Sequence, residues 1–316
     1  MPHPRTRSPL RWRPALLGIM VALLTGCGST AQQTPPSVSP STVSTLDPSG
    51  PSPSAQPPTE QTPSNPSSSA TPPIAPSTTA TASVDAALTG GQLAQRLSTE
   101  VSEPGAFVHV QALQEIADQN GGNRASPSGG YDASVDYVVT VLRAAGYQVS
   151  TPTYPASGDE DHDGGATVRN VLAQTDTGNP ASVVMIGAHL DSVKEGPGIV
   201  DNGSGVAVLL EIASRLGANP STQNAVRFAF FGSEEEGAAG STAYVEGLAA
   251  DGRNKIKLYL NVDMVASPNA GYLVQGGKGG DLSQAGPPGS ETVAQVLADE
   301  LAKTGVTAQT IKFVGR

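Results

Sequence analysis

The sequence predicts an α/β fold in which a mostly parallel sheet lies between layers of helices. Segments with apolar residues at helical spacing alternate with short apolar runs that are typical of strands. One of these runs, VVMIG at residues 183–187, is almost wholly apolar, as expected of a strand covered by helices on both faces. The pattern occupies residues 85–316, a length that suits one domain.

The expected elements follow one another in the order of an α/β protein. Apolar residues recur at helical spacing in Gln92–Val101, Phe107–Gln119 and Ala133–Ala145, and again in Gly205–Leu216 and Glu291–Lys303. Strands are expected at Val183–Gly187, Ala225–Phe231 and Lys257–Val262. The third helix is expected to stop before Gly146, because glycine commonly follows the last helical residue.

The first 27 residues are expected to form an export signal. Four arginines precede the apolar run Pro14–Thr25, which is too short to span a membrane. The run leads into LTGC at residues 24–27, which resembles the bacterial lipobox, whose cysteine carries the lipid of the mature protein. We therefore expect a lipid anchor on Cys27 at the outer face of the bacterial membrane, or release outside the cell. The alternative is an incidental thiol after a signal peptide.

The next segment, residues 28–84, is expected to be a disordered tether. It holds 13 of the 27 prolines, many serines and threonines, and only Asp47 and Glu60 as charged residues. Such a composition cannot bury enough apolar surface to offset the entropy lost on ordering. Since Cys27 is the only cysteine, the domain that follows has no internal disulfide and depends on its core or on a metal.

The charge of residues 85–316 argues against nucleic-acid binding. This region carries 26 acidic and 14 basic residues, and an acidic surface repels a phosphate backbone. A monomer is expected.

Residues suited to metal chemistry stand where the expected strands end. His189 follows the first strand, Glu234 and Glu235 follow the second, and Asp263 ends the third. Asp201 lies in a glycine-rich turn before a helix. The carboxyl ends of strands line one crevice in an open α/β sheet, so these side chains are expected to meet. Imidazole and carboxylate groups are ligands that zinc accepts.

Each of these residues also has a simpler interpretation. A single histidine after a strand is usually only hydrogen-bonded, and residues 201–204 suit turn and helix-cap chemistry. Three successive glutamates, Glu234 to Glu236, suit a solvated helix start, and Glu236 is taken as a surface residue. Asp263 is harder to explain in this way, because an unpaired carboxylate at a buried strand end is costly.

Four segments resemble the successive motifs of the M28 peptidases, the aminopeptidases with two zinc ions: GAHLDSV, GPGIVDNGSGVAVLLEIA, VRFAFFGSEEEGAAGS and LYLNVDMVASPN. GGNRASPSGGYDASVDYV is similar to the family's N-terminal segment. The resemblance implies a three-layer fold with a mixed, mostly parallel sheet, as in the zinc peptidases and their phosphorylase/hydrolase-like relatives.

The resemblance also implies roles for single residues. His189, Asp201 and Asp263 would hold one zinc ion, and Asp201 would bridge to a second, bound also by Glu235. Glu234 would be the general base, and Asp191 would orient His189 by accepting its second ring N–H. Two metals about 3.5–4 Å apart activate a water and polarise the scissile carbonyl. The implied substrates are peptides or proteins with a free N-terminus.

The chain departs from the family pattern at its end. The family's fifth ligand is a histidine after a late strand, whereas this sequence ends at IKFVGR. His3, His109 and His162 are not expected to replace it. We expect the sequence to be cut short before this ligand, the alternative being a short product with an impaired second site. The segment DEDHDGG around His162 is expected to be a solvated turn, with calcium or a third metal as the alternative.

Other functions stay open. A surface lipoprotein that kept the fold without its chemistry is the rival from another class, and a two-zinc carboxypeptidase or a glutaminyl-cyclase-like protein is the rival among enzymes. Serine hydrolases are disfavoured because the sequence has no Gly-x-Ser-x-Gly motif. Cysteine hydrolases are disfavoured because Cys27 serves elsewhere.

Overall fold

The computed structural model describes residues 89–156, 166–267, 269–277 and 287–312. The expected lipobox with Cys27, the tether and the segment DEDHDGG lie outside these residues. Within them, no helix combines the length and apolar character needed to cross a membrane.

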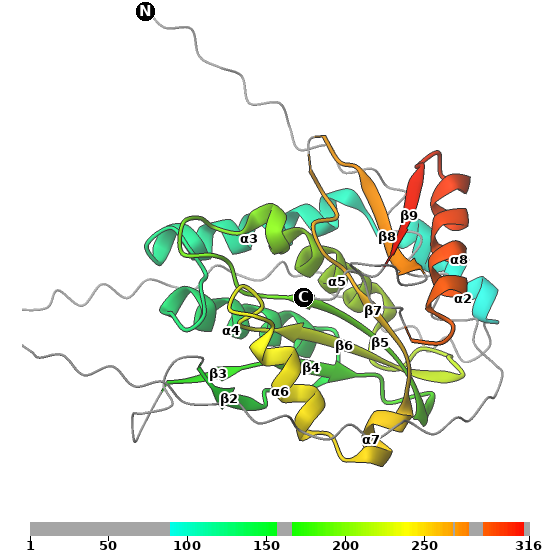
Figure 1. Cartoon of the computed structure of the whole chain (residues 1–316), viewed down its shortest axis with the longest axis horizontal. Helices are drawn as coiled ribbons and strands as arrows, with labels where there is room; N and C mark the ends of the chain where they lie inside the picture. The colour runs from blue at the N-terminus through cyan, green and yellow to red at the C-terminus, as the bar shows by residue number, and fades with distance from the viewer. Residues whose placement is uncertain (1–88, 157–165, 268, 278–286, 313–316) are drawn as a thin grey trace, which may run out of the picture. The chain divides into compact units, whose positions relative to one another are not determined.

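A mixed five-stranded sheet organises the fold (Figure 1). Its strand order is β1-β4-β6-β5-β7, and the two parallel pairings are β6 with β5 and β5 with β7. The pairings of β1 with β4 and of β4 with β6 are antiparallel. The strands are β1 (Gln148–Ser150), β4 (Val171–Gln174), β5 (Asn179–His189), β6 (Asn224–Phe231) and β7 (Ile256–Asn261). The parallel part therefore consists of the three strands expected from the sequence.

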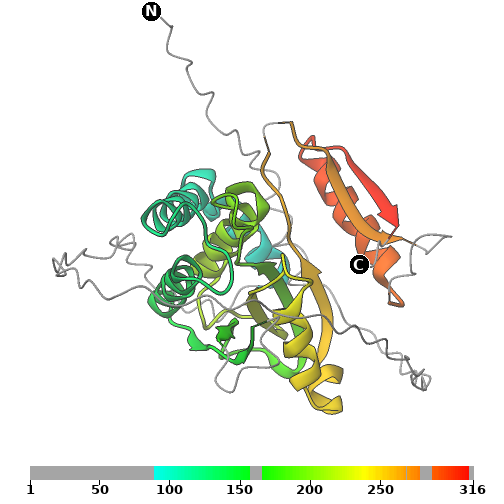
Figure 2. The same ribbon diagram turned by 60° about the vertical axis from the view of Figure 1, so that its left-hand side comes forward.

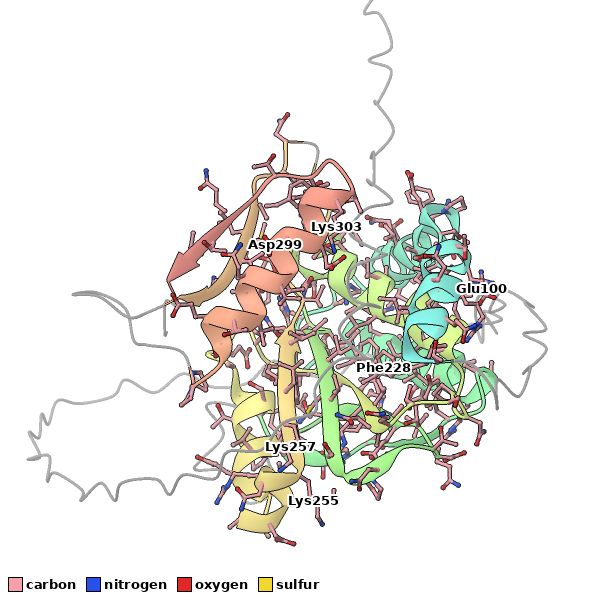
Figure 3. The ribbon with its side chains drawn as sticks, turned by 90° about the vertical axis from the view of Figure 1, so that its right-hand side faces the viewer. Glu100, Phe228, Lys255, Lys257, Asp299 and Lys303 are labelled. Carbon is pink, nitrogen blue, oxygen red and sulfur yellow. The ribbon has the colours of Figure 1, made fainter. Side chains whose placement is uncertain are left out.

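Both faces of the central strands are covered, which confirms the layered α/β architecture. In β6, Phe228 and Phe230 join the main core, whereas Ala229 and Phe231 join a second cluster on the opposite face. Phe228, labelled in Figure 3, is fully buried. Tyr244 of α6 (Ala239–Gly247) packs against the second cluster. Four helices contribute buried residues to the main core: α2 (Gly90–Glu100), α3 (Glu103–Gln119), α4 (Gly129–Ala144) and α5 (Ser204–Leu216).

Two helices begin four residues earlier than the apolar pattern predicts. Helix α3 begins at Glu103 instead of Phe107, since Ser102 accepts a hydrogen bond from the N–H of Gly105. Helix α4 begins at Gly129 instead of Ala133, after Ser128. Apolar spacing marks only the buried face of a helix, while the polar cap fixes where it starts.

Several short elements were not expected from the sequence. Strands β2 (Thr153–Pro155) and β3 (Thr167–Arg169) form an antiparallel pair, and α7 (Ala250–Lys255) precedes β7. Strands β8 (Tyr272–Gly277) and β9 (Ala308–Lys312) form a parallel pair connected through α8 (Ser290–Lys303), as Figure 2 shows. This pair and its helix share a small apolar cluster of Val274, Ala294, Leu301 and Val306.

Candidate metal centre

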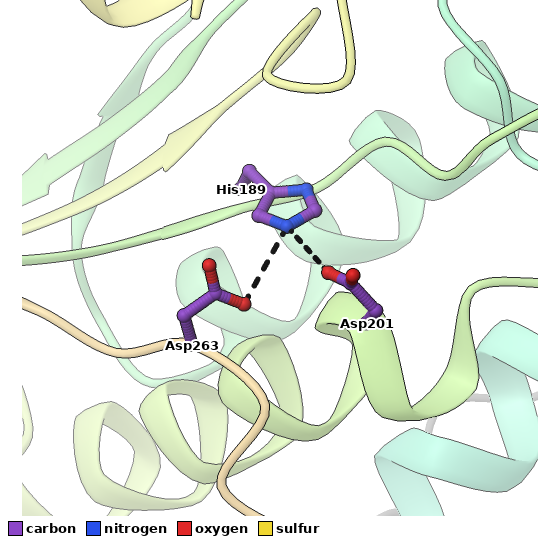
Figure 4. Close-up of side chains that lie close together, drawn as sticks. All are labelled: His189, Asp201 and Asp263. Atoms are coloured by element: carbon purple, nitrogen blue, oxygen red, sulfur yellow. Dashed lines mark hydrogen bonds and ion pairs between the residues drawn. The ribbon is translucent and has the colours of Figure 1, made fainter. Parts of the chain in front are cut away.

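His189, Asp201 and Asp263 come together as the sequence predicts (Figure 4). The Nε2 atom of His189 lies 3.0 Å from Oδ1 of Asp201 and 3.6 Å from Oδ1 of Asp263. One ligand atom from each residue lies within 4.8 Å of the other two. The imidazole is buried, whereas the side chains of Asp201 and Asp263 are 48% and 40% exposed. The expected buried position of Asp263 is therefore wrong, since the chain leaves the sheet before this residue.

The fold explains why distant residues meet here. His189 is the last residue of β5, and Asp263 follows the end of the neighbouring parallel strand β7. Asp201 lies in the π-helical turn η2 (Ile199–Gly203), just before α5, with non-helical backbone angles. Parallel strands bring their carboxyl ends to one edge, and the loop after β5 returns Asp201 to that edge.

Asp191 joins this edge to the end of β6. Its side chain is 1% exposed, and Oδ1 lies 3.4 Å from Nδ1 of His189. The same carboxylate accepts the backbone N–H of Glu234 at 3.1 Å and that of Glu235 at 3.2 Å. One carboxylate thus contacts the candidate ligand histidine and the backbone of both candidate glutamates.

Asn202 joins Asp201 to the segment around Asp263. Its side chain is fully buried; the amide group donates to the Val262 carbonyl at 2.8 Å, and its oxygen accepts the Met264 N–H at 3.2 Å. The same oxygen accepts the N–H of Gly205. The sequence suggested only turn and cap chemistry for Asn202, so this connection was missed.

Arg124 was also missed. It is fully buried, and its guanidinium binds backbone carbonyls of the loop between His189 and Asp201. The sequence did contain one indication of this role. Arg124 is a charged residue among small ones in the segment GGNRASPSGG, which suggests a specific contact. Burial lowers the pKa of Arg124 to about 10, which leaves the side chain charged at neutral pH.

Electrostatics at the site favour a bound cation. Burial alone would lower the pKa of His189, but Asp191, Asp201 and Asp263 raise it to about 12. Burial raises the pKa of Glu235, and the negative charges of Asp201 and Asp191 raise it further. The carboxylates therefore draw positive charge to this position, which a proton on His189 supplies in the metal-free site and a divalent cation would supply in its place.

The donor set fits zinc. One imidazole nitrogen and carboxylate oxygens are ligands that zinc accepts at about 2.0–2.2 Å, and the three residues lie close to the spacing that one ion requires. A pocket of about 180 Å³ is lined in part by Asp191, Glu235 and Glu236; the three candidate ligands do not line it, but Asp191 lies against His189. Space for a small ligand therefore adjoins the candidate site.

Carboxylates and an imidazole at the ends of parallel strands, beside an open pocket, suit metal-dependent hydrolysis. Residues 170–315 match the model of Peptidase family M28. The chain is 48% identical over 185 residues to the "Probable lipoprotein aminopeptidase LpqL" of Mycobacterium tuberculosis, covering 57% of this chain and 37% of that protein. It is 54% identical over 128 residues to an aminopeptidase of Pseudomonas aeruginosa, covering 40% and 24%. The chain thus spans well under two thirds of these relatives.

Solved structures share the fold at low sequence identity. A leucine aminopeptidase precursor from Bacteroides thetaiotaomicron superposes with a TM-score of 0.52 at 18% identity, over 68% of this chain and 79% of that one. The glutaminyl cyclase of the same organism superposes with a TM-score of 0.51 at 17% identity, over 68% and 78%. This chain therefore shares its α/β fold with both structures, and the fold alone does not choose between the two chemistries.

Proposed function

We propose that this protein is an exported, lipid-anchored zinc aminopeptidase that removes N-terminal residues from peptides or proteins. The observation that carries the proposal is the meeting of His189, Asp201 and Asp263 at the ends of parallel strands. The M28 match and the aminopeptidase relatives support it. The name of the M. tuberculosis relative and the lipobox-like Cys27 support the anchored location.

The proposal assigns His189, Asp201 and Asp263 to one zinc ion, with Asp201 and Glu235 serving a second. Bound zinc lowers the pKa of a coordinated water and polarises the scissile carbonyl. The chain's own residues would transfer the protons and orient the ligand side chains. Glu234 accepts the proton of the attacking water and transfers it to the leaving amine.

The acidic surroundings suit a substrate with a free α-amine. Asp191 fixes the backbone of Glu234 and Glu235, so the proposed base and the proposed ligand keep a constant relative position. Glu236 is exposed, although the partial burial of its carboxyl and the nearby charge of Asp191 raise its pKa. Glu236 has no catalytic role in this proposal.

A panel of small substrates tests this function. The purified protein is incubated with zinc and leucine p-nitroanilide, its N-acetylated form, a peptide blocked at its N-terminus, and an N-terminal glutaminyl peptide. The proposal requires hydrolysis of the free-amine anilide and no hydrolysis of the acetylated form. Release of a C-terminal residue from the blocked peptide would indicate a carboxypeptidase, cyclisation of the glutaminyl peptide a glutaminyl cyclase, and complete inactivity with zinc bound a non-catalytic lipoprotein.

A further inference from the structure

Arg124 is a charged side chain in a place where charge is costly. It is 0% exposed, and within the described residues it makes hydrogen bonds to carbonyl groups and no salt bridge. Burying a guanidinium costs free energy unless its donors are satisfied. An apolar side chain would fill the same space at lower cost, so the arginine is explained by the groups that it binds.

Its three donors all reach one loop. The Nη1 group donates to the carbonyl of Leu190, the residue between His189 and Asp191. The Nε group donates to Pro197 at 2.9 Å, and the Nη2 group donates to Gly198 at 2.8 Å. The guanidinium therefore holds both ends of the loop that begins after His189 and leads to Asp201.

The backbone of Arg124 strengthens the same attachment. Its N–H donates to Oγ of Ser192 at 2.9 Å, and its carbonyl accepts the N–H of Ser192 at 3.3 Å. The Ser192 hydroxyl also lies 3.1 Å from the carbonyl of Gly196. The start of the loop is thus fixed by main-chain and side-chain contacts to one residue.

The far end of the loop is connected to the turn that carries Asp201. The carbonyl of Gly198 accepts the N–H of Gly203 at 2.8 Å as well as the Arg124 side chain. Gly198 has a φ of +60°, and a Cβ there would lie 2.6 Å from the Asp201 carbonyl and 3.1 Å from Nη2 of Arg124. Only glycine allows this close approach.

We propose that Arg124 is a positioning residue for the metal centre, which sets the distance between His189 and Asp201 by holding both ends of their connecting loop. The inference rests on the proposed function, since it assumes that these two residues bind zinc. Lysine cannot replace the arginine, because one ammonium group cannot reproduce a planar fork with three donors directed at separate carbonyls.

The test compares Arg124→Lys with the wild type and with Arg227→Lys. Arg227 is a matched control, because its guanidinium binds Gln174 and the Tyr244 hydroxyl on the other face of the sheet. Zinc affinity is measured by competition with a chromophoric chelator, and hydrogen exchange of residues 190–203 is measured in metal-free protein. Arg124→Lys should weaken zinc binding about 10- to 100-fold and accelerate exchange in this loop. Arg227→Lys should change neither.

A second variant keeps the test decisive if Arg124→Lys does not fold. Ser192→Ala removes the hydroxyl that accepts the Arg124 N–H and leaves the guanidinium in place, so it should give a smaller loss of zinc affinity and faster exchange in the same loop. Unchanged affinity and exchange in the folded variants, beside a wild type that binds zinc, would overturn this inference alone. A wild type that binds no zinc would overturn the proposed function and this inference with it.

Discussion

The carboxylate of Asp191 accepts the backbone N–H of Glu234 at 3.1 Å, which connects the end of β5 to the end of β6. The same group accepts the N–H of Glu235 and faces Nδ1 of His189. Asp191 therefore connects the candidate ligand His189 with the backbone of both candidate glutamates, although it is not one of the three residues that converge on the candidate metal position.

Asp191→Asn tests this central position. An asparagine side chain has one acceptor oxygen, so its amide group would face either a backbone N–H or the imidazole as a second donor. We expect zinc affinity and peptidase activity each to fall about 10- to 100-fold. Chelator competition and anilide hydrolysis measure the two effects. Wild-type values for both would show that the contacts of Asp191 serve the fold alone.

Glu234→Gln separates proton transfer from metal binding. The substitution keeps the shape of the side chain and removes its basic group, so turnover should fall about 10²- to 10⁴-fold while zinc content stays unchanged. Glu246→Gln is the matched control and should keep near-normal turnover, because Glu246 is exposed on α6 and does not line the pocket. Full activity in Glu234→Gln, with metal content verified, would refute the general-base assignment.

His109 should make the fold sensitive to acid. It is buried, its Nδ1 lies 2.7 Å from the Tyr137 hydroxyl, and burial followed by the charge of Arg215 lowers its pKa from 6.5 to about 4. Between these values the unfolded chain binds a proton that the folded chain does not, so stability falls as the pH falls. The contribution of this residue is at most about 3 kcal/mol.

Urea unfolding between pH 7 and pH 4 measures this contribution in the wild type and in His109→Gln. The glutamine variant should lose less stability than the wild type across this range, because it has no imidazole to protonate. The difference between the two curves isolates His109 from the other titrating groups. Parallel curves would show that His109 does not titrate in this way.

Cys27→Ser tests the proposed lipid anchor. Without a thiol the chain cannot receive a lipid, so the variant should be released from membranes or should keep its unprocessed N-terminus. Fractionation of cells and mass spectrometry of the N-terminus measure both outcomes. A variant that remains with the membranes and has the same N-terminus as the wild type would contradict the anchor.

The central parallel strands and the helix Ser204–Leu216 were predictable because apolar spacing records burial directly. His189 and Asp263 were predictable because polar residues that follow parallel strands meet at one edge of the sheet, and Asp201 was predictable from its glycine-rich turn and the family resemblance. The antiparallel strands β1 and β4 have three and four residues, too few to show a period. Arg124 and Asn202 act through backbone carbonyl and N–H groups, and such contacts depend on loop shape, which residue spacing does not encode.

The most direct test of the account is the zinc bound per chain by the wild type and by His189→Asn after dialysis against trace zinc. His189 supplies the buried imidazole that both aspartates face. We expect the wild type to retain zinc and the variant, with its fold verified by circular dichroism, to lose it. A wild type without zinc, or a variant that retains as much zinc as the wild type, would contradict the assignment of this cluster as the metal centre.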